Sequence, residues 1–221
     1  KEYYKKKLIQ TINFINKEFK NEENLYGSAY DADSEGVEGK YYVWSYEELK
    51  KILQNDLNLF EKKYEISNTG NFEGKNILVE SINELSKEEQ NKIVEIESKL
   101  IQERKKRVKP FFDNKSQTDL NSFILDTLIN ASIVLEDDNL KNEAIATLKI
   151  LNDKLSNKIY HCYNSKEIDV FLEDYVYYAS LLVTLYEVDE DESALEKSIT
   201  IMKEIWEIFY NKDKQLLQKN R

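Results

Sequence analysis

Two neighbouring carboxylates in the segment Phe171–Tyr175 could act on a polar substrate. The pair is Glu173 and Asp174, and two acids can serve as general acid and general base on a sugar. The segment is also typical of the first turn of a helix, where the helix dipole favours carboxylates for structural reasons alone. The sequence leaves both explanations open, with Glu173 and Asp174 as the catalytic candidates.

A second acidic cluster, Asp31–Gly36, is similar to the first half of a calcium loop, with oxygen ligands at alternate positions and glycine sixth. Such a loop needs a bidentate glutamate at its twelfth position, which Tyr42 occupies here. Calcium is therefore the least favoured explanation, and we assign no metal ligand. The favoured one is a tight turn capped by its own aspartates. A hydroxyl-rich ligand held by these carboxylates and nearby aromatic residues is the third.

Two further features are better explained by structure than by chemistry. The basic run Arg104–Arg107, followed by Lys109, lies at the expected end of a helix, where cations complement the dipole; binding of a phosphorylated ligand is the less favoured alternative. His161 and Cys162 are adjacent, and neighbouring side chains on an extended chain point to opposite sides. A Cys–His catalytic pair is therefore disfavoured.

Composition narrows the classes of partner. A net charge of −10 argues against a nucleic-acid partner. The single cysteine, Cys162, excludes an intramolecular disulfide and fits a reducing, cytoplasmic setting. Apolar runs are too short to predict a membrane helix, and we find no phosphate-loop or dinucleotide motif and expect no cofactor. Because Lys1 lies inside an apparent helical pattern, we expect a fragment of a longer protein.

Helical periodicity dominates from residue 117 to 210. Apolar residues recur at steps of four, three and four on either side of an acidic turn at 136–138. The two sets are Ile124, Leu128, Ala131 and Leu135, then Ala144, Leu148, Leu151 and Leu155. The pattern returns 51 positions later as Tyr175, Ala179, Leu182 and Tyr186, then Leu195, Ile199, Met202 and Trp206. Repeated antiparallel α-hairpins predict a mainly α fold, either a closed toroid or an open solenoid, although two similar amphipathic hairpins could also arise by chance.

The first half of the chain is less regular. Apolar spacing predicts helices over 8–19 and Glu88–Arg107, the second ending before Pro110. Aromatic runs at 26–30 and 40–44 flank a glycine-rich turn, which predicts a β-hairpin near residues 26–44. Ser45 and Glu48 have the spacing of a capping box and predict a short helix through Leu53.

Several blocks resemble the thioredoxin-domain proteins related to spermatogenesis-associated protein 20. The longest is Tyr30–Trp44, followed by Gly70–Leu78, the stretch from Arg104 to Pro110, and Phe171–Tyr175. The resemblance implies a six-hairpin α/α toroid of the glycosidase and N-acylglucosamine epimerase type, incomplete in this chain. It also implies a preceding thioredoxin-like domain and final hairpins that lie outside residues 1–221.

The chain departs from this family pattern at three positions. Phe111 stands where family members usually have histidine, and Leu120 and Ser122 replace the tryptophan and glycine of a Trp-Asn-Gly triplet. Losing an imidazole and an indole would remove a titrating group and a surface for sugar stacking. These departures favour a binding or scaffold domain that serves a thioredoxin-like partner, whereas the intact acidic blocks favour a sugar isomerase or glycosidase-like enzyme.

The enzyme hypothesis predicts a pocket for a sugar or sugar phosphate near the catalytic candidates. The residues expected to shape it are Asp31, Asp33, Glu35, Trp44, Asp113, Lys115, Asn121 and Tyr175.

Overall fold

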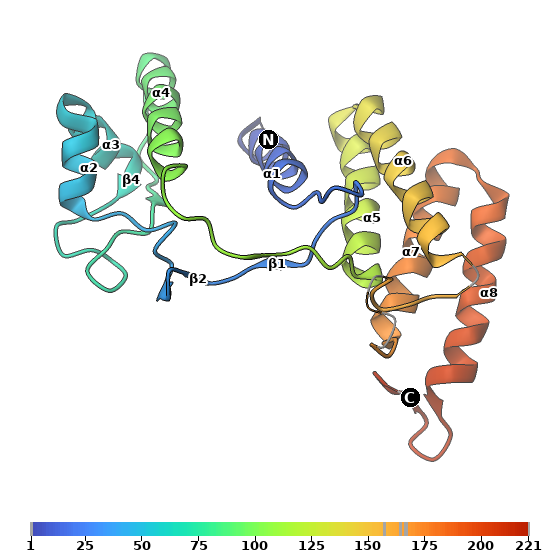
Figure 1. The fold of residues 1–221 in the computed structure, drawn as a ribbon. Helices are drawn as coiled ribbons and strands as arrows, with labels where there is room; N and C mark the ends of the chain where they lie inside the picture. The colour runs from blue at the N-terminus through green and yellow to red at the C-terminus, as the bar shows by residue number, and fades with distance from the viewer. Residues whose placement is uncertain (1, 157, 164, 166–167, 221) are drawn as a thin grey trace. The chain divides into compact units, whose positions relative to one another are not determined.

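The computed structural model describes residues 2–156, 158–163, 165 and 168–220. The chain divides into two compact units, a larger one formed by Lys1–Ala29 and Asp113–Arg221 and a smaller one formed by Tyr30–Phe112. The short strands β1 (Ala29–Tyr30) and β6 (Phe112–Asp113) lie where the chain passes from one unit to the other. Long helices and small antiparallel β-hairpins make up the described residues, which confirms the predicted fold class (Figure 1).

Four helices of 18 residues each form two hairpins in the larger unit (Figure 1). They are α5 (Thr118–Leu135), α6 (Asp138–Leu155), α7 (Leu172–Asp189) and α8 (Glu192–Phe209). α7 packs along both α5 and α8, and α5 also packs along α6. The apolar core runs through these contacts, so each hairpin buries its apolar face partly against its neighbour.

The same turn chemistry joins the helices of both hairpins. α5 and α7 end at glutamates in the left-handed conformation, Glu136 at φ 56° and Glu190 at φ 55°. The next residue caps the following helix: Asp137 accepts two backbone N–H bonds at the start of α6, and Asp191 accepts two at the start of α8. The acidic turn predicted at 136–138 therefore acts as a helix stop and start signal. Its expected return 51 positions later, at 187–189, is wrong, because those residues lie inside α7 and Glu190 and Asp191 form the turn.

The period of the repeat differs from the predicted 51. The first helices of the two hairpins begin at positions 118 and 172 and the second helices at 138 and 192, a period of 54. The predicted core face of α8 is therefore wrong, because Ile199, Met202 and Trp206 are exposed. The residues that α8 buries are Ala194, Ser198, Ile201, Ile205 and Phe209.

The chain before residue 30 completes the larger unit. α1 (Glu2–Glu18) confirms the predicted N-terminal helix and contacts α5, with Ile12 buried. The following loop inserts Leu25 and Tyr26 into the same core. A hairpin of β7 (Tyr210–Asn211) and β8 (Leu216–Leu217) follows α8.

The smaller unit has its own apolar core. It contains α2 (Tyr46–Leu53), the 3₁₀-helix η1 (Gln54–Asp56), α3 (Leu57–Lys63), a hairpin of β4 (Tyr64–Glu65) and β5 (Val79–Glu80), and α4 (Lys87–Arg104). Its buried residues are Trp44, Leu49, Leu53, Leu57, Phe60, Ile93, Ile96 and Leu100. Ser45 caps α2 as predicted. The Glu48 side chain, however, bonds to Arg107.

The predicted β-hairpin is present but shorter than expected. β2 (Asp33–Ser34) pairs with β3 (Val37–Glu38), and Glu35 and Gly36 form the turn, both at positive φ. Two consecutive residues with positive φ match the twist of a tight hairpin. The flanking aromatic runs pair elsewhere, Tyr26 with Lys20 and Trp44 with Asn76, so the prediction that the runs pair with each other is wrong. No helix among the described residues is long and apolar enough to cross a membrane.

Candidate functional site

The two predicted catalytic acids have different surroundings at the start of α7. The Asp174 side chain is 0% exposed, whereas that of Glu173 is 40% exposed. Glu173 Oε1 lies 3.7 Å from Nζ of Lys219, and Glu173 Oε2 is buried with no hydrogen-bond partner among the described residues. Of the two acids, Glu173 is therefore the one that can reach a ligand from solvent.

Protein donors surround the Asp174 carboxylate. Oδ2 accepts the Phe171 backbone N–H at 2.8 Å, and Oδ1 lies 3.0 Å from His161 Nδ1 and 3.3 Å from the Asp119 backbone nitrogen. Burial raises the pKa of Asp174 above its ordinary value, although the bonds from Phe171 and His161 oppose that shift. Asp174 thus holds the start of α7, the start of α5 and the His161 loop together.

The imidazole of His161 has a partner on each ring nitrogen. Nδ1 faces Asp174, and Nε2 lies 3.0 Å from the amide nitrogen of Gln117. Both contacts are satisfied when Nδ1 donates to the carboxylate and Nε2 accepts from the Gln117 amide N–H. His161 was not among the predicted site residues, because the pairing joins a loop to a helix start 13 positions later in the chain and no periodic pattern indicates it.

Three other predicted residues of the larger unit are engaged by protein groups. Lys115 pairs with Asp113 at 2.9 Å. Partial burial works to raise the pKa of Asp113, but the hydrogen bonds from Lys115 outweigh it and lower that pKa. Asn121 is 0% exposed, and its amide accepts from the Tyr26 N–H and donates to the carbonyls of Tyr26 and Gln117. Asn121 therefore fastens the loop after α1 to α5.

Tyr175, the last predicted residue of this unit, lines a cavity of about 320 Å³ among α6, α7 and α8. Its ring packs edge-on against Phe209, 5.4 Å between centroids. Lys197 also lines this cavity, and burial lowers the pKa of its ammonium. Lys197 donates to the Tyr178 hydroxyl at 2.5 Å, so these two polar groups of the cavity bond to each other.

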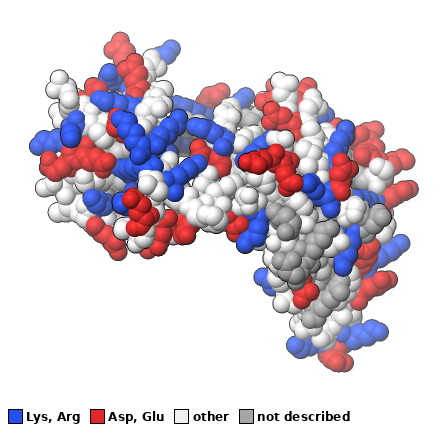
Figure 2. Space-filling view, viewed as in Figure 1, with Lys and Arg blue, Asp and Glu red and all other residues white. Residues whose placement is uncertain are grey.

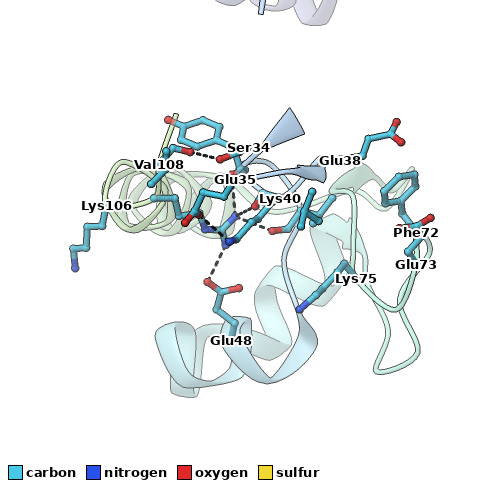
Figure 3. Close-up of a pocket in the computed structure, with 14 residues that line it drawn as sticks. Ser34, Glu35, Glu38, Lys40, Glu48, Phe72, Glu73, Lys75, Lys106 and Val108 are labelled. Carbon is cyan, nitrogen blue, oxygen red and sulfur yellow. Dashed lines mark hydrogen bonds and ion pairs between the residues drawn. The ribbon is translucent and has the colours of Figure 1, made fainter. Parts of the chain in front are cut away.

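A cavity of about 550 Å³ in the smaller unit lies beside the β2–β3 hairpin (Figure 3). Of the predicted site residues, Glu35 is the one that lines it. The other charged lining residues are Glu38, Lys40, Glu48, Glu73, Lys75, Lys106 and Arg107. The apolar and aromatic wall is formed by Val37, Tyr41, Val43, Phe72 and Val108.

Arg107 shapes this cavity by binding backbone. Its guanidinium donates to the carbonyls of Lys40, Tyr41 and Val43 and to the Glu48 carboxylate at 2.8 Å. It also lies 4.0 Å from the centre of the buried Trp44 ring. The predicted pocket residue Trp44 is thus part of the core and supports the arginine that holds residues 40–43 in place.

The charged groups of the cavity differ in how they are paired. Lys40 forms an ion pair with Glu35, and Lys106 forms one with Glu103. Among the described residues no ion pair or side-chain hydrogen bond engages Glu38, Glu73 or Lys75. Acidic and basic groups balance along the wall, and both signs are interspersed over the visible face of this unit (Figure 2). The cavity therefore suits a ligand with many hydroxyl groups better than a highly charged one.

Asp31 and Asp33 are exposed and do not line this cavity. Asp31 Oδ1 accepts the Asp33 backbone N–H at 3.1 Å, the bond that the tight-turn explanation requires. The predicted residues thus fall into both units: Asp31, Asp33, Glu35 and Trp44 in the smaller, and Asp113, Lys115, Asn121, Glu173, Asp174 and Tyr175 in the larger.

Comparison with known proteins gives one distant relative. No family model matches the chain. Human (Homo sapiens) spermatogenesis-associated protein 20 is 25% identical over an alignment 249 positions long, which covers 90% of this chain and 32% of that protein. The chain thus spans about a third of the length of this relative. The similarity extends over nearly the whole chain and supports relatedness to the family indicated by the sequence blocks.

Proposed function

We propose that this chain is a binding domain for a small hydroxyl-rich ligand, a sugar or a sugar phosphate, held in the cavity of the smaller unit. The observation that carries the proposal is the set of groups left for a ligand there: two carboxylates, Glu38 and Glu73, and one ammonium, Lys75, beside the Phe72 ring. Carboxylates accept hydrogen bonds from sugar hydroxyls, and aromatic faces stack on sugar rings. A lysine ammonium can bind a phosphate through its positive charge.

Binding is better supported than catalysis by the predicted acid pair. Glycoside hydrolysis and isomerisation need two groups that reach the substrate. Asp174 is fully buried and bonded to protein donors, so Glu173 would act without its predicted partner. The exposed aromatic ring of Phe111, where relatives have histidine, adds no titrating group.

A sugar isomerase or glycosidase-like activity is the second candidate. The half-exposed Glu173 carboxylate, with one oxygen that accepts no hydrogen bond from the described residues, favours it. Its test is turnover of a panel of reducing sugars and aryl glycosides by the wild-type chain and by Glu173→Gln. Activity that falls with this substitution would support an enzyme, and absence of turnover would leave binding as the function.

The resemblance adds a partner to this proposal. In the family, the helical domain follows a thioredoxin-like domain, and we propose that a thioredoxin-like domain in the cytoplasm is the partner that this chain serves. Addition of a separately produced thioredoxin-like domain to the isotope-labelled chain, followed by NMR shift mapping, tests this contact. Unchanged spectra at high partner concentration would contradict it.

Ligand-observed NMR with neutral sugars and their phosphates tests the binding proposal. We expect Glu38→Gln and Glu73→Gln each to weaken binding of both classes, and Lys75→Met to weaken binding of the phosphates alone. Glu65→Gln is the matched control, because Glu65 is an exposed carboxylate of the same unit outside the cavity wall. Binding that is absent, or that is equally strong in the cavity variants and the control, would overturn the proposal.

A further inference from the structure

Three side chains of the types that bind metal ions lie close together in the larger unit. None of them lines the cavity of the proposed function. Asp119 comes from the first turn of α5, His161 from the loop between α6 and α7, and Asp174 from the first turn of α7. One ligand atom of each side chain lies within 4.8 Å of those of the other two. Nδ1 of His161 is 3.0 and 3.1 Å from the two Asp174 oxygens. Such separations fit donors that share one metal ion, because bonds of about 2 Å at tetrahedral angles place neighbouring ligand atoms about 3.3 Å apart.

The charge of the cluster is a separate observation in favour of a cation. Two carboxylates adjoin one imidazole in a region where Asp174 and His161 are buried. Among the described residues, neither Asp119 nor Asp174 pairs with a lysine or arginine. Buried negative charge without a compensating cation is unfavourable, and a divalent ion would neutralise it.

We propose that Asp119, His161 and Asp174 bind a divalent transition-metal ion, with zinc as the ion that this ligand set suits. One imidazole with two carboxylates is a donor set that zinc accepts, and three protein ligands leave a fourth tetrahedral position for water. The backbone N–H groups of Phe171 and Asp119 already orient the Asp174 carboxylate, as outer-shell donors do in metal centres.

Gln117 supplies the outer-shell partner of the imidazole. Metal binding at Nδ1 needs the tautomer protonated on Nε2, so one proton moves from Nδ1 to Nε2 and none is released overall. The Gln117 amide lies 3.0 Å from Nε2 and, turned over, offers its oxygen as the acceptor of that N–H. Gln117 can thus serve as partner of the imidazole with and without the ion.

Titration of the untagged chain with zinc chloride, followed by calorimetry, tests the site. We expect one ion per chain and at least tenfold weaker binding by Asp119→Asn. Asp138→Asn is the matched control, because Asp138 is an exposed acid in the first turn of α6 and feels the same helix dipole. Cys162→Ser should bind zinc as the wild type does. Equal binding by Asp119→Asn and the wild type, or loss of binding in Cys162→Ser, would overturn the proposal.

A second measurement needs no variant. The chain has one histidine, so a nitrogen-15 spectrum of the imidazole region reports on His161 alone. Zinc should shift the Nδ1 resonance and convert the ring to the Nε2-protonated tautomer. An imidazole spectrum that stays unchanged at saturating zinc chloride would exclude this residue as a ligand and with it the proposed site.

Discussion

The imidazole Nδ1 of His161 lies 3.0 Å from the Asp174 carboxylate in the interior of the larger unit. The contact joins the loop after α6 to the first turn of α7, while Gln117 and Asp119 bring the start of α5 to the same point. The helix starts of the two stacked hairpins are therefore fastened to each other by buried polar groups. Removing one side chain of such a network leaves its buried neighbours without a hydrogen-bond partner.

Stability should depend on pH through Asp174. Burial holds the pKa of Asp174 in the folded state above the ordinary value of 3.8. At a pH between the ordinary and the raised pKa, the folded chain therefore binds more protons than the unfolded chain. Its contribution to the free energy of unfolding is therefore largest below 3.8 and is lost as the pH rises through the raised pKa, with a slope of up to about 1.4 kcal/mol per pH unit.

Urea unfolding from about pH 4 to about pH 7 of the wild type and of Asp174→Asn measures this dependence. The variant cannot titrate at this position, so the difference between the two curves reports on Asp174 together with its neighbours His161 and Asp119 and removes the contribution of more distant acids. A wild-type advantage that grows with rising pH would contradict the predicted sign.

Asn121 should be among the most costly polar residues to remove. Asn121→Ala would leave the N–H and carbonyl of Tyr26 and the carbonyl of Gln117 without their side-chain partner in a buried site. We expect a loss of about 3 kcal/mol in the free energy of unfolding. Asn130→Ala, an exposed position on the same helix, should cost less than about 0.5 kcal/mol. Similar costs in urea unfolding for the two variants would contradict this role.

The helical hairpins were predictable because local spacing encodes them, whereas the candidate sites depend on contacts that spacing does not encode. Periodic apolar residues mark α5 to α8, and capping aspartates begin α6 and α8. The cavity of the smaller unit instead depends on Arg107 binding carbonyls more than 60 positions away. The sequence likewise could not show that Asp174 is buried while Glu173 is half-exposed, because both are ordinary first-turn acids.

The register of α8 illustrates a different limit. This helix carries apolar residues on two faces, and spacing alone cannot select the face that packs. The structure buries Phe209, which lies against Tyr175, and leaves Trp206 54% exposed. Phe209→Ala should therefore cost about 3 to 5 kcal/mol. Trp206→Ala should cost less than about 1 kcal/mol. Urea unfolding followed by circular dichroism measures the free energy of unfolding of both variants. A larger loss for Trp206→Ala than for Phe209→Ala would show that α8 packs through the face predicted from the sequence.

Arg107→Lys should loosen the smaller unit even though the charge is kept. A lysine ammonium cannot donate to three carbonyls and Glu48 at once, and it stacks less well on the Trp44 ring. We expect a local loss of about 2 kcal/mol, which corresponds to roughly thirtyfold faster hydrogen exchange at the Trp44 N–H that bonds to Asn76.

Lys106→Ala is the control for this substitution, because its ammonium is exposed and pairs with Glu103 in the last turn of α4. The control should leave exchange at Trp44 unchanged, since exposed ion pairs contribute little to stability. If Arg107→Lys also leaves it unchanged, the guanidinium does not hold residues 40–43. The cavity wall that the proposed ligand requires would then have to be maintained by the β2–β3 hairpin and the Trp44–Asn76 pairing instead.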